Sequence, residues 1–218
     1  MTVVNRLSDL DLAALLCSRV CHDVISPVGA IANGLELMED SETDEELKNT
    51  AFEMVKSSAR TATAKLKFCR IAFGASGSAG ALIDMGEAGE VASAFMGAEK
   101  AQLNWSVPRE NRPKQEVKLL LNMLLMALTG IPRGGVVTVT AEGRDFSVKA
   151  KGDRAKINEA IAGALNGAAE LTSLDARLVQ PYYARLLAEA AGLKLAMHML
   201  EADTVEVSAK PIEAQAAA

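Results

Sequence analysis

The chain has 218 residues, half of them apolar but only 4% aromatic, with a formal net charge of −5 and an isoelectric point near 5.2. This acidic balance argues against nucleic acid or an anionic membrane surface as a general partner. Because the sequence shows no apolar run of about 18 residues and no basic-then-apolar leader, we expect a cytoplasmic protein without a membrane-spanning segment.

Residues 8–73 predict an antiparallel helical hairpin. Ser8 is a suitable N-cap, and apolar residues then recur at steps of three and four to about Glu39. After a short turn, Thr43 and Glu46 have the spacing of a capping box at the start of a second helix. Each helix would be roughly 30 residues, or about 45 Å, long.

The two helices of this hairpin carry more apolar surface than they can bury against each other. Burying one large apolar side chain contributes roughly 1.5–3 kcal/mol, so an open stripe favours association. We therefore expect a homodimer in which two hairpins form a four-helix bundle. The side chains expected to stay partly open without a second copy are Val24, Ile31, Leu35, Met54 and Leu66.

A polar row runs along the opposite side of the first helix from this apolar stripe. At about 100° per residue, His22 lies roughly 200° from Val20. Neutral imidazole is a good nucleophile near pH 7, and it can carry phosphate on one nitrogen while the other is held by a hydrogen bond. A solvent-facing histidine without a role is the alternative. The whole row is Ser18, Arg19, His22, Ser26, Gly29 and Asn33.

The residues around His22 resemble the H-box of two-component histidine kinases. That motif has a phosphoacceptor histidine, an acid at the next position, proline at plus five and a branched aliphatic at plus six. The matching residues are His22, Asp23, Pro27 and Val28. The resemblance implies that His22 carries phosphate and that Asp23 serves as its hydrogen-bond partner and base. Arg19, one turn earlier, is a natural cation for a phosphoryl group.

Residues 74–80 are a flexible linker by composition, and residues 81–210 predict an α+β domain. The aliphatic run that ends near residue 128 is too short to span a membrane and predicts a buried helix. We expect helices at about 86–97, 113–128, 155–165 and 178–191. We expect strands at about 102–107, 136–140, 146–148, 193–199 and 205–207.

Part of this domain resembles the ATP-binding N-box of the same kinases. The stretch Asn122-Met123-Leu124-Leu125-Met126-Ala127 is followed by Pro132-Arg133-Gly134-Gly135 and a strand, with the spacing of the motif. The second asparagine of the motif, which ligates magnesium on ATP, is Met126 here, and a thioether has little affinity for magnesium. The two glycine-rich motifs that follow in kinases are also missing. The resemblance thus implies a degenerate, Bergerat-type α/β sandwich that binds no ATP.

A histidine-bearing dimerisation hairpin joined to a degenerate ATPase-like domain is similar to the ChpT-type histidine phosphotransferases, over residues 8 to 210. The resemblance implies a phosphorelay intermediate. It would take phosphate from the receiver domain of a hybrid histidine kinase and give it to response regulators of the CtrA and CpdR types. Magnesium would come with the receiver, and this chain would bind no cofactor or metal. Ser18, Ser26, Gly29 and Asn33 would line the contact.

Three other functions remain open. Met126 and the missing glycine motifs argue against an ATP-dependent histidine kinase. The hairpin of a non-catalytic adaptor would dock partners without phosphate, and His22 would then be incidental. A receiver-domain phosphatase would use Asp23 and Ser26. The three cysteines, at positions 17, 21 and 69, are expected to be reduced thiols rather than metal ligands.

Overall fold

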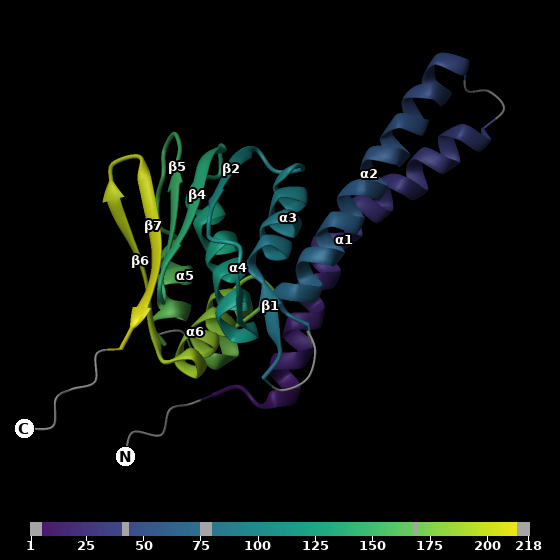
Figure 1. Ribbon diagram of the computed structural model, residues 1–218. Coiled ribbons are helices and arrows are strands. Elements are labelled where there is room, and N and C mark those ends of the chain that lie inside the picture. Colours follow the sequence, from purple (N-terminus) through teal and green to yellow (C-terminus); the bar gives the residue numbers. More distant parts are fainter. Residues whose placement is uncertain (1–5, 41–43, 75–79, 168–169, 213–218) are drawn as a thin grey trace, which may run out of the picture.

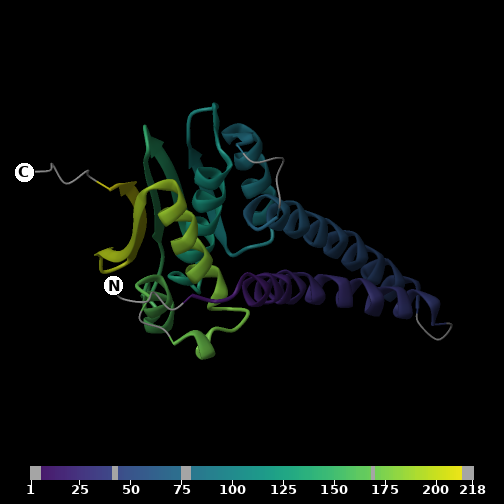
Figure 2. The same ribbon diagram turned by 90° about the horizontal axis from the view of Figure 1, so that it is seen from below.

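The computed structural model describes residues 6–40, 44–74, 80–167 and 170–212. Two long helices come first, α1 (Asp9–Glu39) and α2 (Glu45–Ala72), and they pack side by side as an antiparallel hairpin. The far half of this hairpin projects away from the remainder of the molecule, as both ribbon views show (Figures 1 and 2). The predicted helical hairpin is confirmed.

The two helices of the hairpin begin at different kinds of cap. Ser8 Oγ accepts a hydrogen bond from the Asp11 amide at 3.1 Å, as its predicted N-cap role requires. The N-cap of α2 is Asp44, whose Oδ1 accepts from the Leu47 amide at 2.8 Å. The capping box predicted from Thr43 was therefore wrong, because a carboxylate one position later suits the positive end of the helix better. Thr43 itself lies outside the described residues.

The hairpin helices approach most closely at Gly34. A Cβ at this position would lie 2.6 Å from Val55 Cγ2 and 3.2 Å from the Ala51 carbonyl oxygen. Only Pro27 and Gly34 are buried along the described length of α1. The small residue thus lets α2 pack directly on the backbone of α1, while most side chains of α1 keep access to solvent.

An α+β domain follows the hairpin, as predicted. Strands β1 (Leu82–Asp84) and β3 (Asn111–Pro113) form a short antiparallel pair. A five-stranded sheet has the order β2-β4-β5-β7-β6, in which β2 and β4 are parallel and all other neighbours are antiparallel. Its strands are β2 (Ala101–Ser106), β4 (Gly135–Glu142), β5 (Asp145–Lys151), β6 (Leu193–Glu201) and β7 (Thr204–Pro211).

The helices of this domain lie between its sheet and the hairpin (Figure 1). They are α3 (Met85–Met96), α4 (Lys114–Thr129), α5 (Glu159–Leu165) and α6 (Val179–Ala191), with a 3₁₀ turn, η1 (Leu171–Ser173). Every residue of α4 from Glu116 to Ala127 is buried. The buried helix predicted from the aliphatic run is confirmed, because α4 packs on the sheet on one side and on α2 and α6 on the other.

Only short elements of this domain escaped prediction. β1 and β3 have three residues each, too few to show a period of two. α5 begins at Glu159 rather than near residue 155, because Asn158 caps it through a hydrogen bond from the Ala160 amide to its Oδ1. The predicted strands near residues 136–140 and 146–148 pair with each other, and the predicted C-terminal hairpin is β6 and β7.

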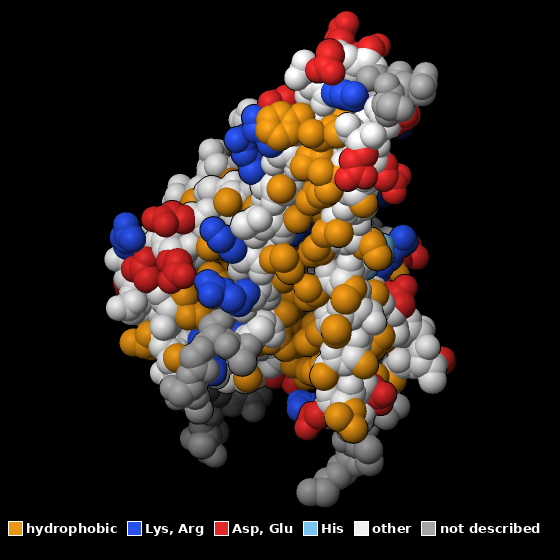
Figure 3. Space-filling model, turned by 90° about the vertical axis from the view of Figure 1, so that its right-hand side faces the viewer, with side chains coloured by type: hydrophobic (Ala, Val, Ile, Leu, Met, Phe, Trp, Pro, Cys, Tyr) orange, Lys and Arg blue, Asp and Glu red, His pale blue; other side chains and the backbone are white. Residues whose placement is uncertain are grey.

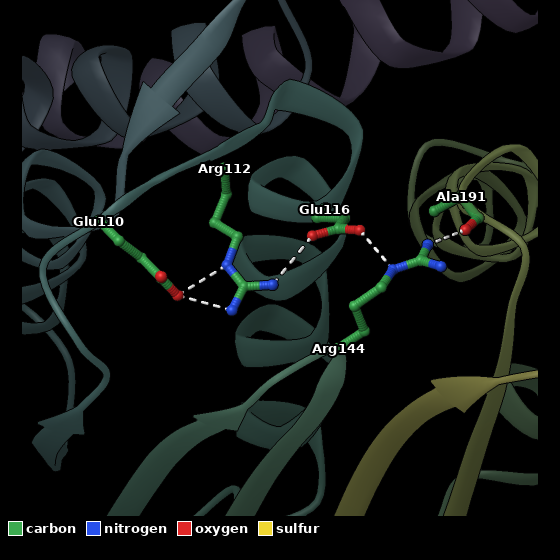
Figure 4. Close-up of polar contacts among 5 residues, drawn as sticks. All are labelled: Glu110, Arg112, Glu116, Arg144 and Ala191. Atoms are coloured by element: carbon green, nitrogen blue, oxygen red, sulfur yellow. Dashed lines mark hydrogen bonds and ion pairs between the residues drawn. The ribbon is translucent and has the colours of Figure 1, made fainter.

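The buried carboxylate of Glu116 connects several elements of this domain through ion pairs (Figure 4). Glu116, in the first turn of α4, has a side chain only 6% exposed and lies 3.4 Å from Arg112 Nη1 and 2.9 Å from Arg144 Nε. Arg112 also bonds Glu110, and Arg144 donates to the carbonyl of Ala191 at the end of α6. The two guanidinium groups compensate the buried charge and join β3, the β4–β5 turn and α6 to α4.

One helix departs from the expectation that no segment could cross a membrane. Among the described residues, α1 is long and apolar enough to do so by length and composition alone. A helix whose apolar side covers a protein partner has the same composition. α1 packs along α2, and its side chains Arg19 and Asp23 lie at the C-terminal domain, so its surroundings are those of an interface helix.

Candidate functional site

The side chain of His22 stands on the exposed surface of α1, where 59% of it is accessible to solvent. Its Nδ1 lies 3.4 Å from Asp23 Oδ1. The other oxygen of the same carboxylate accepts a hydrogen bond from Arg19 Nε at 2.8 Å. Arg19, Asp23 and His22 thus form a chain of polar contacts, in which the first two side chains are only about one-fifth exposed.

This chain of contacts determines which nitrogen of His22 is free to react. Adjacent residues on a helix do not normally face each other, and the long Nδ1–Oδ1 distance reflects that geometry. When Asp23 accepts the Nδ1 proton, the lone pair of the neutral ring resides on Nε2. Nε2 has no hydrogen-bond partner within the described ranges, so it is an accessible nucleophile.

Arg19 has a partner that the sequence analysis did not predict. The sequence predicted a cation for a phosphoryl group, whereas the structure pairs the Arg19 guanidinium with Asp23. A guanidinium that bonds a carboxylate at 2.8 Å already compensates one negative charge. Any contact of Arg19 with phosphate stays a prediction.

The other members of the predicted polar row lie along the exposed side of α1. Ser18, Ser26, Gly29 and Asn33 are all exposed. No atom lies within 4 Å of the position that a Cβ on Gly29 would take, so this glycine leaves open space on the helix surface. The structure therefore brings together Arg19, His22 and Asp23 but leaves the rest of the row facing solvent.

A cavity of about 510 Å³ opens beside His22, between α1 and the C-terminal domain. Arg19, His22 and Asp23 line one wall. The opposite wall comes from the second half of α4, the start of α5 and the segment that leads into α6. Sequence reasoning missed all residues of that wall, because the contact depends on how two distant parts of the chain dock. The polar ones are Thr129, Asn158, Asp175, Arg177 and Gln180.

Leucine packing holds the start of α1 against the segment that leads into α6. Leu12 and Leu15 of α1 contact a small buried cluster that includes Leu174 and Tyr182. The Leu7 amide also donates to the Tyr182 hydroxyl at 3.0 Å. His22 lies two turns beyond Leu15 on the same helix, so this packing fixes the cavity beside it.

The kinase-like N-box positions are parts of the core in this protein. Asn122 is fully buried, and its Nδ2 donates to the carbonyls of Ala72 at 3.2 Å and Lys118 at 2.8 Å. Gln180 of α6 donates to the Asn122 side chain at 3.1 Å. Asn122 thus joins α2, α4 and α6. Met126, at the position of the magnesium-ligating asparagine, is fully buried as well.

The cysteines differ sharply in their surroundings. Cys17 and Cys21 are exposed, whereas Cys69 is buried in the second helix. Burial, with a smaller contribution from the Asp23 charge, raises the pKa of the Cys69 thiol to about 11. Within the described residues, no cluster of three or more His, Cys, Asp or Glu side chains could hold a metal ion.

Comparison with known proteins gives three consistent matches. Residues 85–203 match the family model of the histidine phosphotransferase C-terminal domain. The chain is 49% identical over 209 residues to the protein phosphotransferase ChpT of Brucella abortus (strain 2308), which covers 94% of this chain and 98% of that protein. A solved structure of a bacterial phosphotransferase is 46% identical, with a TM-score of 0.85, and the match covers 96% of this chain and all of the other.

Proposed function

The chain belongs to the histidine phosphotransferase family, whose members exchange phosphate with two-component receiver partners in phosphorelays, and we propose that His22 is its phosphoryl carrier. The observation that carries this proposal is the chain of contacts from Arg19 through Asp23 to His22. These contacts leave His22 Nε2 exposed and place His22 Nδ1 at the carboxylate of Asp23. The match of these residues to the H-box supports the same assignment.

The reaction is a transfer of a phosphoryl group between an aspartate and a histidine. The Nε2 lone pair of His22 attacks the phosphorus of the receiver's aspartyl phosphate. The N–P bond forms while the P–O bond breaks, and the aspartate leaves with the bonding electron pair as a free carboxylate. A second receiver's aspartate then takes the group from His22 by the reverse step. Both steps need the three atoms in line.

Asp23 supports this transfer from the other side of the ring. Phosphorylation at Nε2 makes the imidazole more positive, and a carboxylate at Nδ1 stabilises that charge. Arg19 orients the carboxylate of Asp23 through the hydrogen bond from its Nε. In this proposal magnesium arrives with the receiver, and the exposed Ser18, Ser26, Gly29 and Asn33 form the surface on which the receiver docks.

We further propose that the protein acts as a homodimer. Figure 3 shows hydrophobic side chains gathered in a band over the hairpin. A groove of about 360 Å³ between α1 and α2 is lined by apolar side chains that include Leu16, Val20 and Leu66. The five side chains predicted to stay open, at positions 24, 31, 35, 54 and 66, are all at least partly exposed. A second hairpin placed on this band would complete a four-helix bundle.

The remaining features of the proposal concern ligands and partners. We propose that the chain binds no ATP, because Met126 is buried in the core and Asn122 is engaged with backbone carbonyls and Gln180. We propose the receiver domain of a hybrid histidine kinase as the donor and regulators of the CtrA and CpdR types as acceptors, in the cytoplasm.

The contacts of Asp23 argue against the phosphatase alternative. A phosphatase needs a free carboxylate or amide to orient water on the receiver's phosphate. Both Asp23 oxygens already have partners, Arg19 for Oδ2 and His22 for Oδ1.

Phosphotransfer from a phosphorylated receiver tests the proposed function. The wild type should take the label from the receiver, whereas His22→Ala should take none. Loss of phosphate from the receiver without a labelled phosphotransferase, in both proteins, would show a phosphatase. Receiver binding without transfer or hydrolysis would show an adaptor. His198→Ala serves as the matched control, since it removes the other histidine of the chain, which lies on β6, and leaves His22 and Asp23 in place.

A further inference from the structure

Phosphorylation of His22 creates a charge that α1 cannot compensate. The phosphoryl group on Nε2 adds negative charge on the residue next to Asp23, whose carboxylate is also negative, and like charges repel. Arg19 is the only lysine or arginine between Asp9 and Glu39. Its guanidinium already bonds Asp23 at 2.8 Å. A cation from another element would compensate this charge.

Arg177 is the cation that the C-terminal domain brings to the same cavity. It lines the wall opposite His22, in the segment between η1 and α6. Its side chain is exposed, and its guanidinium forms no hydrogen bond or ion pair with any residue in the described part of the chain. An arginine without a partner on the wall of a small cavity is available for an anion that enters it.

The carboxylate of Asp175, the nearest acid on this wall, is committed to the backbone. Its Oδ1 accepts hydrogen bonds from the amides of Arg177 at 2.8 Å and Leu178 at 2.9 Å. The bond from Leu178, with that from Arg177 and the Arg177 charge, lowers the pKa of Asp175. Asp175 thus fixes the backbone of Arg177 without pairing with its guanidinium.

The leucine cluster at the base of α1 determines where Arg177 lies. Leu178, the next residue, packs in the same cluster as Leu12 and Leu15 of α1. Figure 2 shows this green segment beside the purple start of α1. Because His22 follows Leu15 by two turns, packing of Leu178 on the helix brings its neighbour Arg177 to the wall that faces His22.

We propose that Arg177 binds the phosphoryl group on His22 and compensates its charge until a receiver takes it. This inference rests on the proposed role of His22. The planar guanidinium can bond two phosphoryl oxygens at once, which a lysine cannot do in the same way. The degenerate domain then has a direct role in the reaction, because it supplies a cation where the kinases it resembles present a nucleotide.

Chemical loading of the histidine tests this contact without a receiver. Phosphoramidate transfers its phosphoryl group to histidine with release of ammonia. His22→Ala identifies the signal that belongs to His22, since His198 is also exposed and can be loaded. The pH titration of the phosphohistidine is then followed by phosphorus NMR, and its loss at pH 7 by time course, in the wild type, Arg177→Gln and Arg177→Lys. Arg109→Gln is the matched control, because Arg109 pairs with Asp84 and Glu90 and does not line the cavity.

The contact should hold the phosphoryl pKa down in the wild type. Arg177→Gln should raise that pKa and speed the loss of phosphate roughly two- to fivefold, in proportion to one partly exposed charge contact. The difference should shrink at high salt. Arg177→Lys should restore part of it, and Arg109→Gln should behave as the wild type.

Two results would overturn the inference. One is a titration and lifetime in Arg177→Gln equal to those of the wild type. The other is an equal loss of phosphate in the Gln and Lys variants with an unchanged titration, which would mean a structural role. Transfer from a phosphorylated receiver is measured in parallel. If the wild type accepts no phosphate from the receiver, the proposed function fails; if transfer is normal and the Arg177 variants change nothing, only this inference fails.

Discussion

Two long apolar helices of this protein, α1 and α4, differ completely in what covers them. All residues of α4 from Glu116 to Ala127 are buried, whereas α1 buries only Pro27 and Gly34 within the described residues. Large side chains of α1, such as Ile25 at 70% exposure, remain open to solvent. Apolar composition alone therefore does not distinguish a buried core helix from a helix whose apolar surface is exposed.

The buried helix α4 contributes to the stability of the C-terminal domain, whereas the exposed surface of α1 is available to binding partners. In the core of the C-terminal domain, the hydrogen bonds of Asn122 hold α2, α4 and α6 together. The hairpin keeps an exposed imidazole and an uncovered apolar band. Substitutions of buried residues should therefore change stability, and substitutions of exposed hairpin residues should change assembly or transfer.

The largest effect should come from a charge in the apolar band of the hairpin. Leu66 is half exposed and lines the groove between α1 and α2. Leu66→Glu should abolish the dimer, because a second hairpin would bury the new carboxylate without a partner. Asn33→Glu, on the opposite side of α1, should leave the dimer intact. Light scattering checks both; a wild type that runs as a stable monomer near 23.0 kDa at micromolar concentration would refute the bundle.

The next effect concerns the closest contact inside the hairpin. Gly34→Ala places a Cβ 2.6 Å from Val55 Cγ2 and against the Ala51 carbonyl, so we expect a loss of about 1–3 kcal/mol in the free energy of unfolding. Gly29→Ala is the matched control, because the space there is open and alanine favours a helix by up to about 1 kcal/mol. Urea unfolding of both variants measures the difference. Equal stability of the two would contradict the packing described here.

In the C-terminal domain, a change of similar size should follow from removal of the buried charge at Glu116. Glu116→Gln leaves the nearly buried Arg112 without its full counter-charge and should cost about 1–3 kcal/mol. Glu110→Gln, whose carboxylate is nearly half exposed, should cost no more than about 1 kcal/mol. Thermal unfolding monitors both, and receiver phosphotransfer by the folded Glu116→Gln protein should remain normal.

The last prediction concerns Mg-ATP, which we expect not to bind to the protein. Titration of the wild type with Mg-ATP in a calorimeter should give no heat of binding at millimolar concentration. The reason is that Met126 offers no ligand for magnesium and the glycine-rich motifs are missing. Saturable heat would show that the C-terminal domain binds ATP, and that ligand binding is then not confined to the hairpin.

The sequence predicted those features that short stretches of chain encode by themselves. The hairpin follows from helical periodicity and from Ser8 as a cap, and the candidate site, which stays a prediction, follows from the spacing of His22, Asp23 and Pro27. The buried state of α4 follows from its continuous aliphatic residues. Each of these depends on neighbours within about two helical turns.

The missed features depend on contacts between distant parts of the chain. Nothing near Arg177 indicates that it lines the same cavity as His22, since 154 residues separate them and contacts such as the leucine cluster bring their two segments together. The pairing of Arg19 with Asp23 depends on side-chain conformation, which spacing alone cannot decide. Similarly, Asn122 is recognisable as an N-box residue, but its role as a bridge to Ala72 and Gln180 becomes visible only in the folded protein.

The most direct test of the central claim is to compare two phosphate donors on one residue. Wild type and His22→Ala are incubated separately with a phosphorylated receiver and with Mg-ATP, each carrying labelled phosphate, and the labelled residue is located by mass spectrometry. We expect label on His22 of the wild type from the receiver alone, in an acid-labile form, and no label on His22→Ala from either donor. Label on His22→Ala, or label on the wild type from ATP, would contradict it.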